Sequence, residues 1–324
     1  MRTLRVPTGH IIIIDGERGR QLECLSLGDY GKDVNLSERP VQHTELLPLT
    51  EKWVITISTQ YGCSMSCNFC DVPRVGPGLN ATFNDMVEQI DAAIALHPEI
   101  RGTKRLNVHF ARMGEPTWNP HVLAVASALR DLARDRWFPY GSAHVHPVVS
   151  TMMPANNHRL REFIGRWLWL KNAYYGGEAG LQLSINSTDE GERMVMFGGR
   201  AMPLTHISSL MATMPNPVGR KYTLNFAVAG YTVDAERLRD LFPPSLFVCK
   251  LTPMHKTERA TEAGIRTDGD YTTCEPYEDL ARRLRAVGFD VLVFITSREE
   301  DEGRITCGNA ILSGTTPLCE WREE

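Results

Sequence analysis

Three cysteines stand within eight residues of one another, at positions 63, 67 and 70, with the spacing C-x3-C-x2-C. A short loop that carries three thiols brings them towards one point, which indicates a metal centre rather than three core residues. A closed zinc site needs a fourth ligand, and no Cys or His stands at partner spacing. A ferredoxin-type run also needs a fourth nearby cysteine. The spacing therefore favours a [4Fe–4S] cluster with one iron left for a non-protein ligand over a zinc site.

The segments around these cysteines alternate between short apolar runs and amphipathic stretches. The apolar runs predict strands at 53–58, 106–111, 143–150, 181–185, 222–228, 247–251 and 290–296. Helical periodicity falls at 82–96, 122–134, 159–166, 235–242 and 276–287. This rhythm predicts an α/β fold, a partial (β/α)6 TIM-type barrel over residues 51–324 with a carboxy-terminal strand and loop. Functional residues are expected just after each strand.

The first fifty residues predict a small β-hairpin appendage, with strands at Ile11–Asp15 and Gln21–Leu27 around a glycine turn. The segment Met254–Glu275 is expected to be a long loop, such as a lid over substrate.

The composition limits the classes of function. The 324 residues carry 35 Lys and Arg against 39 Asp and Glu, a net charge of −4, so no global basic field points to a polyanion. No signal peptide or membrane span can be drawn, which predicts a cytoplasmic protein without a membrane partner. Eight cysteines, three of them clustered, fit metal or redox chemistry in a reducing compartment.

The cysteine motif, with the aromatic Phe69 before its last cysteine and a position after the first barrel strand, resembles the radical S-adenosylmethionine (SAM) superfamily. Further segments resemble one branch of it, the adenosine methyl synthases RlmN and Cfr, which act on ribosomal RNA. The matching blocks follow in order along the chain: Ser58–Cys63, Asn107–Phe110, Met113–Pro116, Ser150–Thr151, Leu183–Ser184, Asp189–Glu190, Gly288–Phe289 and Ile305–Gly308.

The resemblance implies a set of roles. Cys63, Cys67 and Cys70 would hold the [4Fe–4S] cluster, and SAM would be cleaved to a 5′-deoxyadenosyl radical with an electron from a donor such as flavodoxin or ferredoxin. Cys307 matches the cysteine that carries the methyl group to an sp2 carbon, and Glu115 matches the residue that holds the SAM amino group. The other residues expected at the SAM site are Phe69, Gly114, Ser150, Ser184, Asn186 and His255.

The chain departs from the RlmN and Cfr pattern at several positions. The family has a second catalytic cysteine seven residues before the first cluster cysteine, where this chain has Thr56. Only about fifty residues precede the barrel, so the amino-terminal helical domain of the family is not expected. These differences, with the acidic net charge, favour an acceptor other than ribosomal RNA, either another RNA adenosine or a small molecule. The thiols left as substitutes for the second cysteine are Cys24, Cys249, Cys274 and Cys319.

Two other functions stay open. One is a radical SAM enzyme without methyl transfer, in which Cys307 donates a hydrogen atom or anchors the substrate. The other is a non-enzymatic metal-binding protein. The basic residues near Trp167 and Trp169, together with these aromatic side chains, could bind and stack on nucleic acid. The favoured interpretation of this segment is a solvated helix followed by a strand whose tryptophans pack in the core.

Overall fold

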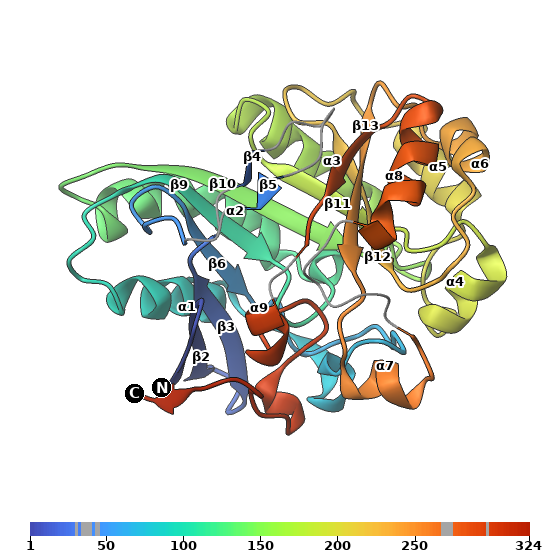
Figure 1. Ribbon diagram of the computed structural model, residues 1–324. Helices are drawn as coiled ribbons and strands as arrows, with labels where there is room; N and C mark the ends of the chain where they lie inside the picture. Colours follow the sequence, from blue (N-terminus) through green and yellow to red (C-terminus); the bar gives the residue numbers. More distant parts are fainter. Residues whose placement is uncertain (30–31, 34–40, 43–45, 267–274, 296–297) are drawn as a thin grey trace.

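The computed structural model describes residues 1–29, 32–33, 41–42, 46–266, 275–295 and 298–324. Its main feature is one curved sheet, whose described strands follow the order β14-β13-β12-β11-β10-β9-β6-β3-β2-β1-β15 (Figure 1). The parallel part consists of β6 (Trp53–Ile57), β9 (Thr103–Phe110), β10 (Ala143–Thr151), β11 (Gly180–Ser184), β12 (Tyr222–Val228), β13 (Phe247–Pro253) and β14 (Asp290–Val293). The predicted α/β partial barrel is confirmed.

The amino-terminal hairpin extends this sheet. Strands β2 (Gly9–Asp15) and β3 (Gln21–Leu27) form the predicted hairpin, and β3 pairs antiparallel with β6. On the other side, β1 (Arg2–Val6) joins β2 and the carboxy-terminal β15 (Arg322–Glu323), so that the two termini meet (Figure 1). The boundary drawn at residue 50 stays a prediction, because the sheet runs across it.

Helices cover the outer face of the parallel strands. They are α1 (Phe83–Ala95), α2 (His121–Leu132), α3 (Leu160–Trp169), α4 (Glu190–Met196), α5 (Leu204–Ala212), α6 (Ala235–Leu241) and α8 (Glu275–Ala286). The first of them begins at a capping box in which Thr82 Oγ1 accepts from the Asp85 amide and Asp85 accepts from the Thr82 amide. Its Met86, Val87 and Ile90 are buried in the core.

The loops carry shorter elements. Strands β7 (Gln60–Gly62) and β8 (Pro77–Asn80) form a small ribbon beside the sheet, as do β4 (Lys32–Asp33) and β5 (Val41–Gln42). Helices α7 (Glu258–Glu262) and α9 (Arg298–Glu302) lie in the carboxy-terminal third. The expectation of an unstructured segment over Met254–Glu275 was therefore wrong for residues 258–262, while residues 267–274 lie outside the described structure.

Two tryptophans correct another expectation. Trp167 and Trp169 both belong to α3, not to a strand, and the helical period separates them: Trp167 is fully buried and Trp169 is 62% exposed. Among the described residues, no helix has the length and apolar character needed to cross a membrane.

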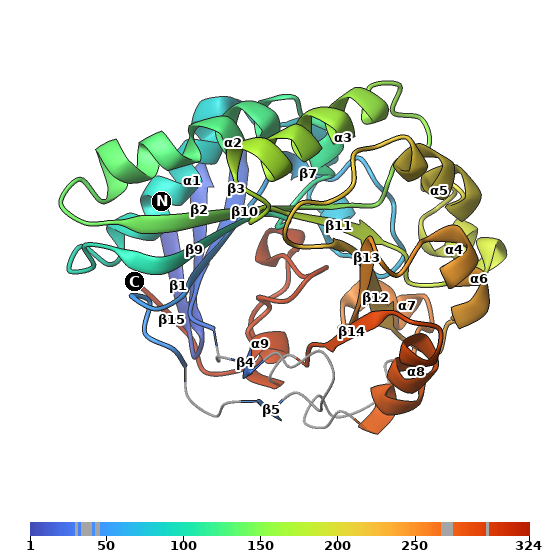
Figure 2. The same cartoon turned by 90° about the horizontal axis from the view of Figure 1, so that it is seen from above.

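The parallel strands present two different faces. The side chains that point towards the helices are apolar and fully buried, for example Ile55, Val108 and Leu251. Most of those on the inner face are polar and half-buried: Thr56, His109, Ser150, Gln182, Ser184, Thr223, Asn225 and Lys250. Val148 and Val248 lie in the same rows. Figure 2 shows the sheet curving around the segment that contains α9.

Candidate active site at the carboxyl edge of the sheet

The three clustered cysteines lie in one loop that begins directly after β7. Gly62, the last residue of β7, has a φ of +81°, and a Cβ there would lie 2.1 Å from the Gly76 carbonyl oxygen, so only glycine fits. Cys67 is buried at 6% exposure, and Cys63 and Cys70 are half-buried. The side chains that pack around the thiols include Met65, Met196 and Phe197. The loop thus provides an apolar environment for sulfur.

The three thiols influence one another. Burial raises the pKa of Cys63 to about 12, and burial together with the neighbouring sulfurs raises the pKa of Cys67 and Cys70. In the ranges that the structure describes, no three Cys, His, Asp or Glu side chains are already gathered as a metal site. Three soft sulfur donors on eight residues nevertheless fit a thiolate-ligated iron centre, since a bound metal deprotonates the thiols that burial keeps neutral.

Glu115 follows β9 and is held by four donors. Its Oε1 accepts from the Thr117 amide (3.1 Å), the Thr117 hydroxyl (2.8 Å) and the Thr151 hydroxyl (2.7 Å), while Oε2 accepts from the Met152 amide (2.8 Å). Burial raises the pKa of Glu115, and these hydrogen bonds oppose the rise. Since Oε2 receives only one of these four bonds, it has the capacity to accept from a ligand amine.

Gln60 connects the Glu115 loop to the cysteine loop. Its Oε1 accepts from the backbone amides of Ser64 (3.1 Å) and Glu115 (3.0 Å). The close approach depends on Gly114, whose φ is +97° and whose added Cβ would lie 2.6 Å from the Gln60 Cβ. The predicted cluster ligands and the predicted SAM ligand are therefore fixed relative to each other.

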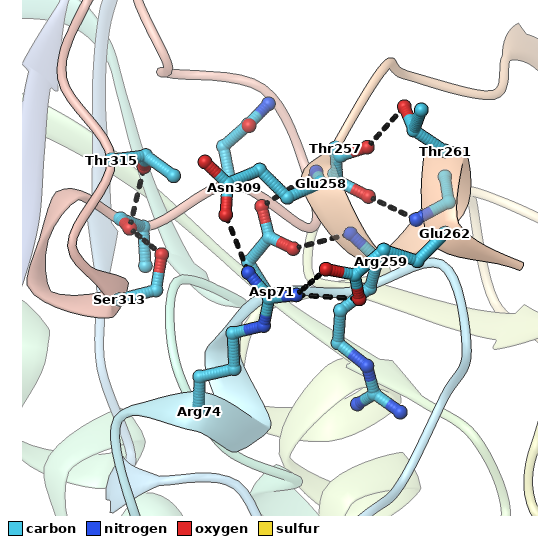
Figure 3. A network of polar contacts seen from close by, with 12 residues as sticks. Asp71, Arg74, Thr257, Glu258, Arg259, Thr261, Glu262, Asn309, Ser313 and Thr315 are labelled. Carbon is cyan, nitrogen blue, oxygen red and sulfur yellow. Dashed lines mark hydrogen bonds and ion pairs between the residues drawn. The ribbon is translucent and has the colours of Figure 1, made fainter.

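Asp71, directly after the last cysteine of the loop, joins it to two later segments (Figure 3). Its carboxylate accepts from the backbone amides of Glu258 (3.2 Å) and Arg259 (2.9 Å) at the start of α7. Its own amide donates to the Gly308 carbonyl oxygen at 2.8 Å. Arg74 adds ion pairs to Glu258 and Glu262. The segment that carries Cys307 is thereby bonded to the cysteine loop.

Cys307 is exposed to solvent, although enough protein surrounds it for burial to raise the pKa of its thiol. The nearby charges of Lys250 and Arg112 oppose that rise. The charge of Cys307 in turn raises the pKa of Cys67 and of Cys70. The structure therefore brings the predicted carrier cysteine to the same edge of the sheet as the three clustered thiols.

A buried ion pair holds the Cys307 segment in place. Arg112 and Glu23 have side chains only 2% and 0% exposed, and the Arg112 Nε donates to Glu23 Oε1 at 2.8 Å. The same guanidinium donates to the carbonyl oxygens of Thr306 (3.3 Å) and Arg304 (2.8 Å). Sequence reasoning missed both residues. The only available signal was the position of Arg112 directly before the Met113–Pro116 block.

The remaining predicted SAM residues surround the same edge. Phe69 packs against Phe197, with ring centroids 6.0 Å apart. Ser150 donates to Gln182 Oε1 at 3.3 Å, and Ser184 ends β11 on the inner face. Asn186 is buried with a φ of +59°, and its Oδ1 accepts from the Ala227 amide at 2.9 Å, so it stabilises a turn. His255 follows β13 and lies 3.3 Å from Asp301.

The thiols considered as substitutes for the second cysteine are spread over the molecule. Thr56 lies in register with His109 on the inner face. Cys24 and Cys249 are fully buried, as a core position predicts for Cys249, and Cys319 is half-buried beside Gly303. Cys274 lies outside the described residues. Of the described candidates, the two buried cysteines belong to the packed core rather than to the inner face.

Comparison with known proteins finds RNA methyltransferases among the relatives of this chain. The dual-specificity RNA methyltransferase RlmN of Sorangium cellulosum is 27% identical over 81% of this chain and 62% of its own length. A probable RNA methyltransferase of the same organism is 26% identical over 74% of this chain and 52% of its own length. No family model matches the chain. The predicted resemblance to the RlmN and Cfr branch is confirmed.

A solved structure shares the fold. A radical SAM methyltransferase from Sphaerobacter thermophilus superposes with a TM-score of 0.64 at 19% identity and covers 95% of this chain and 80% of that protein. The chain spans only between about half and two thirds of the length of the two curated relatives.

Proposed function

We propose that this relative of the RlmN-type RNA methyltransferases is a radical SAM enzyme that methylates an sp2 carbon through Cys307. Cys63, Cys67 and Cys70 would hold a [4Fe–4S] cluster, whose chemistry when bound is to supply the electron that cleaves SAM. The acceptor is an RNA adenosine or a nucleotide-like or other small molecule.

The observation that best supports this proposal is the hydrogen bond between the Asp71 amide and the Gly308 carbonyl oxygen. It joins the residue after Cys70 to the residue after Cys307, so both segments keep one geometry. A carrier cysteine has to lie within reach of both the cluster edge and the acceptor. Glu115, fixed to the cysteine loop through Gln60, would orient SAM by accepting from its amino group at Oε2.

The first experiment tests the cluster. Anaerobic reconstitution of the wild type with iron and sulfide should give a brown protein that cleaves SAM, whereas Cys63→Ala should lose both iron and cleavage. Cys319→Ala is the matched control, because it removes a half-buried thiol of another segment. A Cys63→Ala protein that binds iron and cleaves SAM as the wild type does would refute the cluster assignment.

The second experiment tests the carrier. With SAM and reductant, peptide mass spectrometry should find a methyl group on Cys307, and the solution should contain both S-adenosylhomocysteine and 5′-deoxyadenosine. The position of Thr56 on the inner face, where the family has a thiol, favours one other function: Cys307 as a hydrogen-atom donor without methyl transfer. The appearance of 5′-deoxyadenosine with an unmodified Cys307 would support that function instead.

A labelled-methyl transfer assay identifies the acceptor class. Total RNA and a small-molecule extract are incubated separately with the reconstituted enzyme and SAM labelled in its methyl group. A Cys307→Ala protein serves as the control for label that does not pass through the carrier.

A further inference from the structure

Lys250 differs from the other lysines that are buried or half-buried. Lys171, which is fully buried, donates to the carbonyl oxygens of Gly177 and Val218. Lys52 pairs with Asp29 at 2.8 Å, and Lys221 pairs with Asp290 at 2.6 Å. For Lys250, the described residues provide no carboxylate partner, and its ammonium group lies 4.8 Å from the centre of the Phe294 ring. Burial lowers its pKa, and the charges of Cys307 and Asp29 oppose this change. A desolvated ammonium group without an anion is costly, and such groups often mark a ligand site.

The side chains in line with Lys250 are suited to bind a polar ligand. Strand register places Ser184, Asn225 and Lys250 in one row across β11, β12 and β13. The next row contains Ser150, Gln182 and Thr223 and ends at Asp290, whose charge is neutralised by Lys221. The inner face near Lys250 therefore offers neutral hydrogen-bonding groups and a cation.

Arg220 extends this positive region, and the uncharged imidazole of His109 lies beside it. His109 faces the same interior, and burial together with the charges of Lys250 and Arg220 lowers its pKa to about 3. Strand register aligns His109 with Val148 and Val148 with Gly180. The Arg220 guanidinium lies near this row, because a Cβ added at Gly180 would lie 3.6 Å from the Arg220 Nη1. Glu178 lies beside this end of the sheet, 3.3 Å from His146, and its charge opposes the burial that lowers the pKa of Arg220.

The electrostatic neighbours of Lys250 include Cys307. A ligand anion held by Lys250 would therefore lie within the electrostatic influence of the thiol proposed as the carrier. A cation and neutral hydrogen-bond donors on a partly desolvated surface bind a phosphate or carboxylate more strongly than the same cation and donors would in bulk water.

We propose that Lys250 binds an anionic group of the acceptor, a phosphate or a carboxylate, on the inner face of the sheet and so positions the acceptor beside Cys307. This inference rests on the proposed function, since it concerns the acceptor of the same site. It narrows the substrate class to molecules with at least one anionic group, and it makes Lys250 a specificity-determining residue.

The test is isothermal titration calorimetry of the anaerobically purified wild-type protein, with inorganic phosphate in one titration and acetate in another. At least one of the two anions should bind saturably. The anion that binds more tightly indicates whether the acceptor group that Lys250 binds is a phosphate or a carboxylate. Lys250→Met should weaken that binding by about tenfold or more, while Lys250→Arg should retain most of it. Lys104→Met is the matched control, because Lys104 is a surface residue that is 74% exposed.

A second readout needs no variant. Limited acetylation of the wild type, followed by peptide mass spectrometry, should modify Lys250 more slowly in the presence of the binding anion, while the rate at Lys104 stays the same. The proposal is overturned if the wild type binds neither anion, if Lys250→Met binds as the wild type does, or if the anion does not protect Lys250. Neither readout requires SAM turnover, so a failed anion site and a failed methyl transfer are distinguished.

Discussion

Removal of Glu23 should destabilise the whole protein. In Glu23→Ala, the buried Arg112 guanidinium keeps only the carbonyl oxygens of Thr306 and Arg304 as partners, and Glu23 Oε2 no longer accepts from the Leu312 amide. One unpaired buried charge typically costs about 3–5 kcal/mol of unfolding free energy. Because both side chains are at most 2% exposed, solvent does not screen this loss, and we expect a value in that range.

Urea denaturation followed by circular dichroism measures the change in unfolding free energy. Arg112→Met should cost a similar amount, and the double variant Glu23→Ala with Arg112→Met should cost clearly less than the sum of the two single changes. Arg134→Met is the control: Arg134 pairs with Asp135 on the surface at 67% exposure, so its loss should leave the unfolding free energy nearly unchanged.

The same variants should loosen the segment that carries Cys307. Iodoacetamide should therefore alkylate Cys307 faster in the folded variants than in the folded wild type. The reasoning is refuted if each single variant costs less than about 1 kcal/mol, or if the double variant costs the full sum.

Two further predictions concern backbone strain and pH. Gly114→Ala should lower the unfolding free energy by roughly 2 kcal/mol or more, because the φ of Gly114 is +97° and the added Cβ would meet Gln60. The control is Gly165→Ala, inside α3 with open space around it, which should be neutral or stabilising. Equal effects of the two changes in urea denaturation would contradict this prediction. The lowered pKa of His109, about 3 against 6.5, means that the unfolded chain binds an extra proton between these values. Stability should therefore fall as pH decreases below about 6.5, and His109→Gln should show a shallower fall between pH 7 and 5; an unchanged slope would argue against a neutral His109.

Local sequence signals were sufficient for much of the fold and part of the site. The spacing of Cys63, Cys67 and Cys70 and the apolar period of α1 are properties of short segments, and they predicted a thiol-bearing loop and a helix that the structure contains. The alternation in β13 also carried a signal that was overlooked: a lysine, Lys250, in the middle of a strand with a core cysteine beside it.

The contacts that fix the site join distant segments and leave no local pattern. Glu23 and Arg112 are 89 residues apart, and Arg112 and Thr306 are 194 residues apart. Helix α7 was missed because it is only five residues long and receives part of its amino-terminal cap from Asp71, which lies 187 residues earlier than Glu258. Such short elements depend on tertiary partners rather than on their own propensity.

The position of the Cys307 segment in the chain affects how the protein is assembled. Ribosomes synthesise the cysteine loop, Glu115 and the parallel strands before residues 304–312, which supply the bonds to Arg112 and Asp71. Until that segment emerges, the cysteine loop lacks the hydrogen bond from the Asp71 amide to Gly308 and the close approach of Gly308 to Cys70. The arrangement that holds Cys307 at the cysteine loop is therefore among the last parts of the site to form as the chain is made.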